Sequence, residues 1–207
     1  MYIPNHFKVT DFDEIRAFIE KHSFGTIVTS DQGNPIATHL PLELHKQGDD
    51  YYITGHMAYG NAQWKTLRDD NVLVMYQGPH AYISSSWYTA EDVPTWNYQA
   101  VHVYGTASIM SEEELQEDLI LLLQKYESHR KHPVLWENLS EQAKKQIKGI
   151  VGFKVKVEEV QAAYKLSQNR MEEDYHTIID NLAEEKDFNS QQIARAMKNR
   201  ETKGELP

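Results

Sequence analysis

Short strand-forming runs separated by turn sequences fill the first half of this chain, and they limit its fold more than any other feature. Residues 24–30 and 35–44 flank Asp31-Gln32-Gly33-Asn34, so the two runs are predicted to form a hairpin. A second turn at residues 47–50 precedes a strand at residues 51–55. Successive short strands of this kind favour a closed or partly closed antiparallel barrel.

Further strands are expected along the rest of the chain. Apolar residues run from 72 to 77, and strand character continues from 81 to 88. A loop at residues 89–95 then leads into residues 96–110, whose alternation predicts a long strand. Residues 150–157 are predicted to form the last strand.

Two of the predicted helices begin with a capping box, in which a side chain at the helix start bonds to the third helical residue. Asp11 and Glu14 form one ahead of a helix at residues 11–22, and Ser111 and Glu114 form the other ahead of residues 111–127. Leu115, Leu119 and Leu122 then give the second helix an apolar stripe.

Shorter helices are expected at residues 62–67 and 140–147. A highly charged C-terminal tail is predicted to hold two more, at residues 171–185 and 190–199, with Asn189 or Ser190 capping the second. The chain is therefore expected to fold as a mixed β-barrel with helices over residues 1–170, followed by a helical tail over residues 171–207.

The formal charge of −10 describes an acidic surface, which disfavours direct binding to the phosphate backbone of DNA. The tail carries basic residues, but acidic residues interrupt them, so duplex DNA is expected to bind weakly and without sequence preference. These basic residues are Lys186, Arg195, Lys198, Arg200 and Lys203.

No run approaches the roughly 18 apolar residues of a membrane span, and the chain starts with no secretion-signal pattern, so we expect a cytoplasmic protein without a membrane partner. The absence of cysteine excludes disulfides, thiolate metal sites and a cysteine nucleophile. Redox chemistry would therefore need a cofactor.

The densest polar and aromatic segment runs from Gly55 to Lys65, where a strand end turns into a short helix. Free N–H groups at a helix start, with Asn61, Gln63 and Lys65 beside them, suit a phosphate. A capped turn with an interfacial Trp64 explains the same residues.

Other polar residues favour structural interpretations. His39, His56, His80 and His102 lack the spacing of a local metal site, so we expect hydrogen-bonded strand histidines rather than metal or haem ligands. The serines at residues 84–86 have no Gly-x-Ser-x-Gly frame, which argues against a hydrolase. No catalytic residue and no metal ligand is assigned.

Trp96, Asn97 and Tyr98 offer two flat rings and an amide, which suit a planar heterocycle. Packing in a core or a dimer interface explains them equally well. Residues 166–170 form a short polar segment after the last predicted strand. This segment could cap a helix or reach a phosphate.

Taken together, these stretches resemble the PaiB family of bacterial negative transcriptional regulators, in the superfamily of split barrels that bind flavin mononucleotide (FMN). The resemblance covers nearly the whole chain. It is carried by residues 1–7, 37–41, 55–56, 61, 63–64, 78–84, 86–88, 93–98, 150–153 and 165–170.

The resemblance implies an antiparallel FMN-binding split barrel that forms a homodimer with flavin pockets between subunits. It also implies repression of sporulation and extracellular-protease genes, but not whether repression acts through DNA, a regulatory protein partner or a metabolite. Thr38, His39 and Leu40 would run along the flavin ring edge. His56, Asn61, Gln63, Trp64 and Lys65 would surround the phosphate, and Trp96, Asn97 and Tyr98 would come from the partner subunit.

The sequence departs from the family pattern at three positions. Tyr59 replaces an expected arginine, and Ala62 and Ser85 replace expected prolines. Because a guanidinium binds phosphate more strongly than a neutral hydroxyl, we expect FMN affinity to be about ten- to a hundredfold lower than in an arginine-bearing relative.

The favoured function is a flavin-binding, or flavin-fold, transcriptional repressor without turnover of its own. The alternative is a flavin-dependent oxidoreductase, in which the bound ring carries the chemistry. A third interpretation is a cofactor-free interaction module. An obligate dimer is expected because the aromatic groove around Trp87, Trp96 and Tyr98 would otherwise face water.

Overall fold

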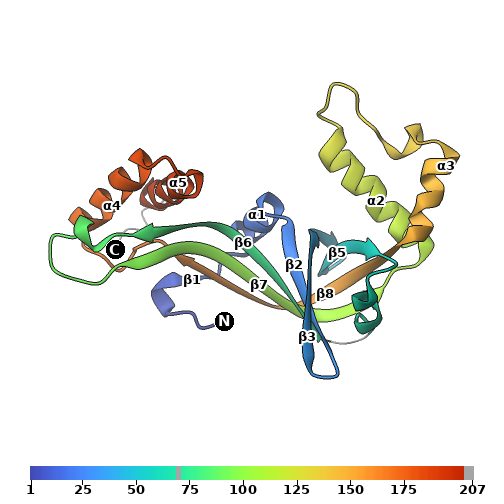
Figure 1. Cartoon of the computed structure of the whole chain (residues 1–207), viewed down its shortest axis with the longest axis horizontal. Helices are drawn as coiled ribbons and strands as arrows, with labels where there is room; N and C mark the ends of the chain where they lie inside the picture. The colour runs from blue at the N-terminus through green and yellow to red at the C-terminus, as the bar shows by residue number, and fades with distance from the viewer. Residues whose placement is uncertain (69–70, 203–207) are drawn as a thin grey trace. The chain divides into compact units, whose positions relative to one another are not determined.

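A computed structural model describes residues 1–68 and 71–202, and these residues form eight strands and five helices (Figure 1). The strands are β1 Lys8–Val9, β2 Phe24–Asp31, β3 Asn34–Pro41, β4 Glu43–Gln47, β5 Asp50–Ala58, β6 Asn71–Ile83, β7 Thr95–Ile109 and β8 Ile150–Lys165. The helices are α1 Phe12–Lys21, α2 Glu112–Glu127, α3 Glu141–Lys144, α4 Glu172–Glu184 and α5 Phe188–Thr202. Short 3-10 turns are η1 Asn5–Phe7, η2 Ala62–Thr66, η3 Ser85–Trp87, η4 Trp136–Asn138 and η5 Lys145–Gly149.

The strands form one sheet in the order β3-β2-β6-β7-β8-β5-β4, with β1 paired to β8. The pairs β1–β8, β2–β3, β2–β6, β4–β5 and β5–β8 are antiparallel. The predicted class, antiparallel strands with helices, is confirmed.

The chain divides into two compact units, and each is assembled from separate segments. Unit 1 consists of Met1–Phe18, Tyr76–His102 and Gln161–Pro207, and unit 2 consists of Ile19–Met75 and Val103–Val160. Strands β6, β7 and β8 each contribute residues to both units. Helices α4 and α5 belong to unit 1, and the domain boundary at residue 170 stays a prediction.

The predicted hairpin forms, and its turn has the expected chemistry. Asp31 pairs with Asn34, while Gln32 and Gly33 between them have φ angles of 50° and 86°. Two positive φ angles in a two-residue loop match the right-handed twist of the flanking strands.

The predicted strand at 35–44 is wrong in extent, because β3 ends at Pro41 and β4 begins at Glu43. Proline has no N–H to continue a ladder, and the next N–H, of Leu42, donates to the Ser23 carbonyl at 2.8 Å. The chain therefore leaves β2 at this point and pairs with β5 instead.

Strand β6 differs from the sequence prediction at both its middle and its end. It runs continuously through Gly78 and Pro79, because Gly78 admits the ring of Phe18, which would lie 2.7 Å from a Cβ atom there. It stops at Ile83 rather than residue 88, since Ser84 caps η3 by accepting the Ser86 N–H.

Strands β7 and β8 are the long strands of the fold. β7 matches the predicted strand at 96–110, whereas β8 continues past the predicted end at 157 to Lys165. At Gly105 the two strands approach so closely that a Cβ atom would lie 1.9 Å from the Lys156 carbonyl oxygen. This position therefore admits only glycine.

Both predicted capped helices are confirmed. Asp11 accepts the N–H groups of Asp13 and Glu14 at the start of α1, and Ser111 and Glu114 form the capping box of α2. The predicted helix at 140–147 is shorter, because it divides into α3 and the 3-10 turn η5.

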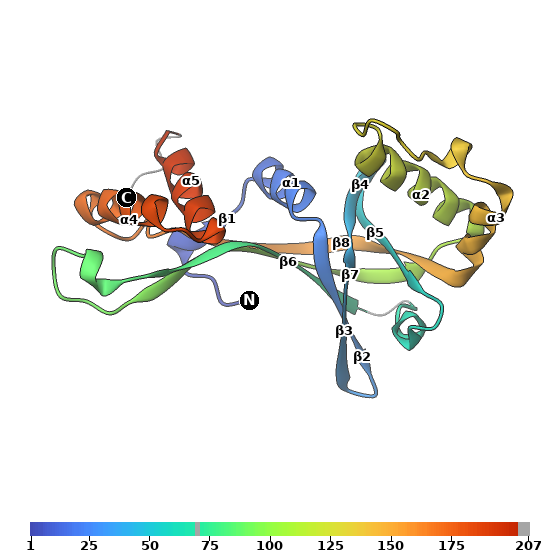
Figure 2. The ribbon, with the colours of Figure 1, turned by 45° about the horizontal axis from the view of Figure 1, so that its top comes forward.

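The two tail helices form as predicted, but the predicted cap of the second is wrong. Helix α5 begins at Phe188, and Asp187 accepts the Ser190 N–H at 2.8 Å, so Asp187 takes the place expected for Asn189 or Ser190. Figure 2 shows α4 and α5 side by side in unit 1. Lys203, the last basic residue expected in the tail, lies outside the described residues.

Each unit has its own apolar core. In unit 1 the buried side chains of the tail include Tyr175, Ile178, Leu182, Ile193 and Met197. In unit 2 α2 lies over β5, as Figure 2 shows, and the fully buried strand residues include Ile27, Ile53, Val103, Phe153 and Val155.

Candidate functional site

The turn η2, which follows β5 in unit 2, carries most of the residues that were predicted to surround the flavin phosphate. Asn61 caps it, because its Oδ1 accepts the Gln63 N–H at 3.1 Å while its own N–H donates to the Ala58 carbonyl at 2.8 Å. The segment is therefore a capped turn, with two of its leading N–H groups already bonded to protein.

Gln63 joins this turn to the β2–β3 hairpin. Its side chain is buried, and Nε2 lies 3.2 Å from the Ile27 carbonyl, 3.1 Å from Thr29 Oγ1 and 3.1 Å from the Ile36 carbonyl. Thr38 donates its hydroxyl hydrogen to Gln63 Oε1. The amide is thus satisfied by protein, and it positions the turn instead of facing a ligand.

Thr38, Asn61 and Gln63 come together in one hydrogen-bonded cluster. Besides donating to Gln63, Thr38 Oγ1 accepts from Asn61 Nδ2 at 3.0 Å. Leu40 lies on the same face of β3 as Thr38, two residues along, and it is buried. His39 points to the opposite face and is exposed.

Two rings and two cations lie at the exposed side of η2. Trp64 Nε1 donates to the Tyr59 carbonyl at 3.0 Å, and the two ring centroids are 5.6 Å apart. Lys65 Nζ and the Arg68 guanidinium lie 5.9 Å and 5.6 Å from the Trp64 ring centroid. Positive charge therefore gathers beside exposed aromatic surface.

His56 lies on the face of β5 that α2 covers. It pairs with Gly152, where a Cβ atom would lie 2.7 Å from Leu115 of α2, and directly opposed residues point to the same face. Burial lowers the pKa of His56, and the negative charge of Asp118 on α2 opposes this only in part. The structure thus places His56 with α2 and not within the Thr38–Asn61–Gln63 cluster.

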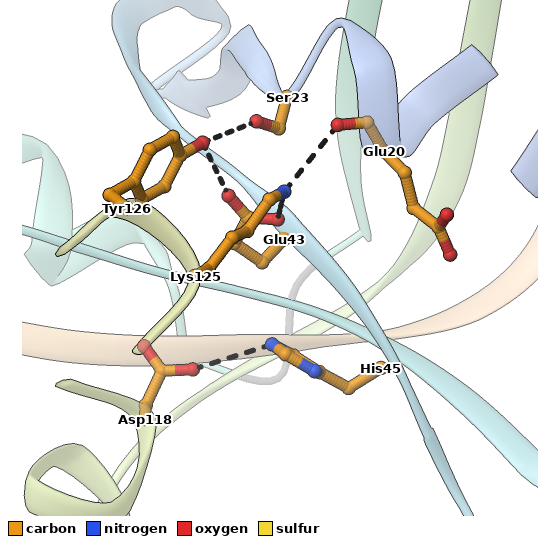
Figure 3. A network of polar contacts seen from close by, with 7 residues as sticks. All are labelled: Glu20, Ser23, Glu43, His45, Asp118, Lys125 and Tyr126. Atoms are coloured by element: carbon orange, nitrogen blue, oxygen red, sulfur yellow. Dashed lines mark hydrogen bonds and ion pairs between the residues drawn. The ribbon is translucent and has the colours of Figure 1, made fainter. Parts of the chain in front are cut away.

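A polar network holds the last turn of α2 against β4 (Figure 3). Glu43 is buried and accepts from Lys125 Nζ and from the Tyr126 hydroxyl, which is also 2.7 Å from Ser23 Oγ. Every polar atom of the Glu43 carboxylate therefore has a partner, and the network serves to anchor the helix.

Near the N-terminal half of the same helix, His45 Nε2 lies 3.8 Å from Asp118 Oδ1 (Figure 3). Asp118 therefore faces both His45 and His56. Within residues 1–68 and 71–202, no three acidic or histidine side chains gather closely enough to hold a metal ion.

The predicted residues of unit 1 differ in accessibility. Asn97 is fully buried, and its amide bonds to Ser167 Oγ at 2.9 Å and lies 3.7 Å from the Met197 sulfur of α5. Trp96 exposes 53% of its surface and lies beside Tyr82, with ring centroids 5.9 Å apart. Tyr98 is half-buried. Trp96 is therefore the member of this group that a ligand or a second chain can reach most easily.

The polar segment after β8 is used within unit 1. Gln168 accepts the Leu166 N–H and donates to the Tyr164 carbonyl, while Arg170 pairs with Asp92. The Arg170 guanidinium also lies 4.1 Å from the centroid of the Tyr88 ring.

Among the helices that the structure describes, none is long and apolar enough to cross a membrane.

Comparison with known proteins decides the family. The family described as "Putative FMN-binding domain" matches residues 1–159, which is more than half of the chain. The chain belongs to this FMN-binding domain family. The match ends before α4 and α5, so the tail helices lie beyond the family domain.

A relative from Bacillus subtilis (strain 168) shows similarity over almost the full length. It is the "Protease synthase and sporulation protein PAI 2", which is 59% identical over 97% of this chain and 98% of its own length. The resemblance to the PaiB family is thereby confirmed.

Solved structures support the fold. The flavocytochrome Anf3 from Azotobacter vinelandii aligns with a TM-score of 0.61 and 16% identity over 84% of this chain and 78% of that chain. The FAD and haem binding protein from Mycobacterium smegmatis aligns with a TM-score of 0.59 and 13% identity. This alignment covers 76% of this chain and 73% of that chain. The split-barrel fold expected for the FMN-binding domain family is confirmed.

Arg68, which lies beside Trp64 just after η2, is a cation that the sequence interpretation missed. It supplies a guanidinium close to Trp64, although Tyr59 occupies the position where the family pattern has arginine. No helical spacing would have indicated it, because the 3-10 turn η2 ends at Thr66 and Arg68 lies beyond its C-cap, Leu67.

Proposed function

We propose that this chain is a flavin-binding negative regulator of sporulation and extracellular-protease genes, and that it acts as a cytoplasmic homodimer. The observation that carries the proposal is the 59% identity to the Bacillus subtilis sporulation protein across nearly the whole of both chains. The match of residues 1–159 to the FMN-binding domain family supports the flavin.

The residues around η2 fit a flavin phosphate. Lys65 and Arg68 are exposed and, within the described part of the chain, neither has a carboxylate partner. They would therefore hold the phosphate by charge, while Gln63 and Thr38 keep the turn in place. The bound flavin would supply reversible uptake of electrons, which suits a sensor as well as an enzyme.

The proposed dimer rests on the exposed aromatic side chains of unit 1. Trp96 and Tyr82 expose 53% and 48% of their surface, and a second copy would cover them. Light scattering at micromolar concentration should report two chains. A stable monomer would contradict both the dimer and the contribution of Trp96 to the partner's flavin site.

Flavin binding is tested by a titration with a matched control. Lys65→Ala should weaken FMN binding about tenfold, since a charged hydrogen bond contributes about 1.5–3 kcal/mol. Lys46→Ala is the control, because Lys46 is another exposed lysine beside a ring, 5.8 Å from the Tyr51 centroid. Riboflavin, which has no phosphate, should bind all three proteins equally. Equal FMN binding by both variants would remove Lys65 from the phosphate site.

Regulation is tested in a Bacillus subtilis strain that lacks its 59%-identical relative. Expression of this chain should lower extracellular protease activity and spore counts, and the Lys65→Ala variant should do so less if flavin is part of the signal. Unchanged protease and spore counts with the intact chain would contradict the regulatory function. Steady oxidation of a nicotinamide reductant by the flavin-loaded protein would instead assign the oxidoreductase function.

A further inference from the structure

We propose that the Tyr59–Trp64 ring pair is a stacking surface for adenine, so that the site prefers flavin adenine dinucleotide (FAD) over FMN. This inference rests on the proposed flavin-binding function and names the flavin that the site selects. It is built from side chains of unit 2 alone.

Tyr59 presents a firmly held and accessible ring. It exposes 62% of its surface, although its backbone is fixed at both polar groups. Its N–H donates to the Gly149 carbonyl at 2.8 Å, and its carbonyl accepts from Trp64 Nε1 at 3.0 Å. Because the backbone of Tyr59 is already ordered, a base that stacks on its ring pays little additional conformational entropy.

The ring of Tyr59 is also supported from one side. Its plane is tilted by 31° from that of Trp64, at a centroid distance of 5.6 Å, so the two rings form a partly stacked pair. Trp64 is half-buried, whereas most of Tyr59 faces water. A third aromatic ring would therefore extend this stack on the exposed side of Tyr59.

The charges beside the rings suit a pyrophosphate. Lys65 and Arg68 both lie within 6 Å of the Trp64 ring centroid, at 5.9 Å and 5.6 Å. The pyrophosphate of a dinucleotide places two negative charges between its flavin and its adenine, so cations and stacking rings are needed close together. The segment that contains η2 supplies both within ten residues, from Tyr59 to Arg68.

Tyr59 stands where the family pattern has arginine, and this replacement affects the binding of FMN and FAD differently. FMN ends at its phosphate and gains nothing from an exposed ring beyond it, whereas an arginine at this position would serve the FMN phosphate directly. Base stacking on an aromatic side chain strengthens binding by about five- to a hundredfold. We therefore expect FAD to bind about tenfold more tightly than FMN.

The test is a calorimetric titration of riboflavin, FMN and FAD against the full chain and three variants. Tyr59→Ala should lower FAD affinity about tenfold and leave FMN affinity within twofold, while Tyr59→Phe should keep the preference because it keeps the ring. Tyr2→Ala is the matched control, since Tyr2 is a tyrosine of unit 1 that exposes 88% of its surface. Circular dichroism verifies that every variant is folded.

Each result has a distinct meaning. Binding of FMN as tight as that of FAD, or equal losses of both in Tyr59→Ala, would overturn the adenine proposal and leave the flavin function standing. Conversion of a dimer to a monomer by Tyr59→Ala, with FAD affinity per chain unchanged, would overturn it by showing that the ring contacts a second copy. Failure of all three flavins to bind the unaltered chain would overturn the flavin function itself.

Discussion

Replacement of Gln63 by leucine should destabilise the protein far more than its place in a short surface turn suggests. The side chain exposes 1% of its surface. Its amide donates through two hydrogens, and its carbonyl oxygen accepts from Thr38, so it forms three good hydrogen bonds at a time here. The available partners are the Ile27 and Ile36 carbonyls, Thr29 Oγ1 and the Thr38 hydroxyl.

The magnitude follows from these three bonds. Leucine has a similar volume but cannot replace any of them, and each buried bond contributes about 1 kcal/mol net. The expected loss is about 3 kcal/mol in the free energy of unfolding, which for a chain of this size lowers the Tm by about 6–12 °C. The Thr29 hydroxyl would keep one hydrogen-bond partner in this variant, because Thr66 also donates to it at 2.7 Å.

The assay is thermal and urea denaturation of Gln63→Leu beside Gln47→Leu, in which an exposed glutamine at the end of β4 is changed in the same way. The control should stay within about 0.5 kcal/mol of the unaltered protein. Thr38→Val should cost about 1–2 kcal/mol, since it removes both the donor to Gln63 Oε1 and the acceptor for Asn61 Nδ2. Equal stabilities of the two glutamine variants would refute the anchoring role of Gln63.

Three further predictions concern pH, the tail and DNA. Burial lowers the pKa of His22, His56 and His102, so the unfolded state binds more protons and the Tm should fall as the pH drops below about 6.5. His56→Gln should reduce this slope, and an unchanged slope would contradict the burial of His56. Asp187→Ala should cost about 1 kcal/mol in urea denaturation through loss of the α5 cap, unlike Asp180→Ala at an exposed position. Because the net charge is −10, the purified protein should shift promoter DNA only weakly in gels, and specific nanomolar binding would contradict this.

Local features of the fold could be predicted from the sequence because their causes are local. The capping box of Ser111 and Glu114 and the turn at residues 31–34 each involve residues close together in the chain, and both form as expected. The course of β6 through Gly78 could not be predicted, because it depends on Phe18, sixty residues earlier. Likewise, the length of β8 depends on its pairing with β1 at Ala162 and Ala163.

In the candidate site, too, some features could be expected from the sequence and others depend on contacts with distant residues. The resemblance to a known family assigned Thr38 to the flavin ring edge and Asn61 and Gln63 to the phosphate, and in the structure these three side chains share hydrogen bonds. It could not indicate that the Gln63 side-chain amide forms its hydrogen bonds with the β2–β3 hairpin, or that Asn97 is buried against α5. Both facts depend on which distant groups reach a polar side chain, and sequence spacing does not record this.

The division of unit 1 into three segments limits how this protein can be taken apart. Residues 1–18, 76–102 and 161–207 must all be present before that unit has its complete set of partners. A fragment that ends at residue 170 would keep Asn97 but lose Met197, and it would keep Thr89 but lose Asp174, whose Oδ1 accepts the Thr89 N–H at 2.8 Å. Removal of the tail helices would therefore break contacts within unit 1, and neither unit can be transplanted as one continuous stretch of gene.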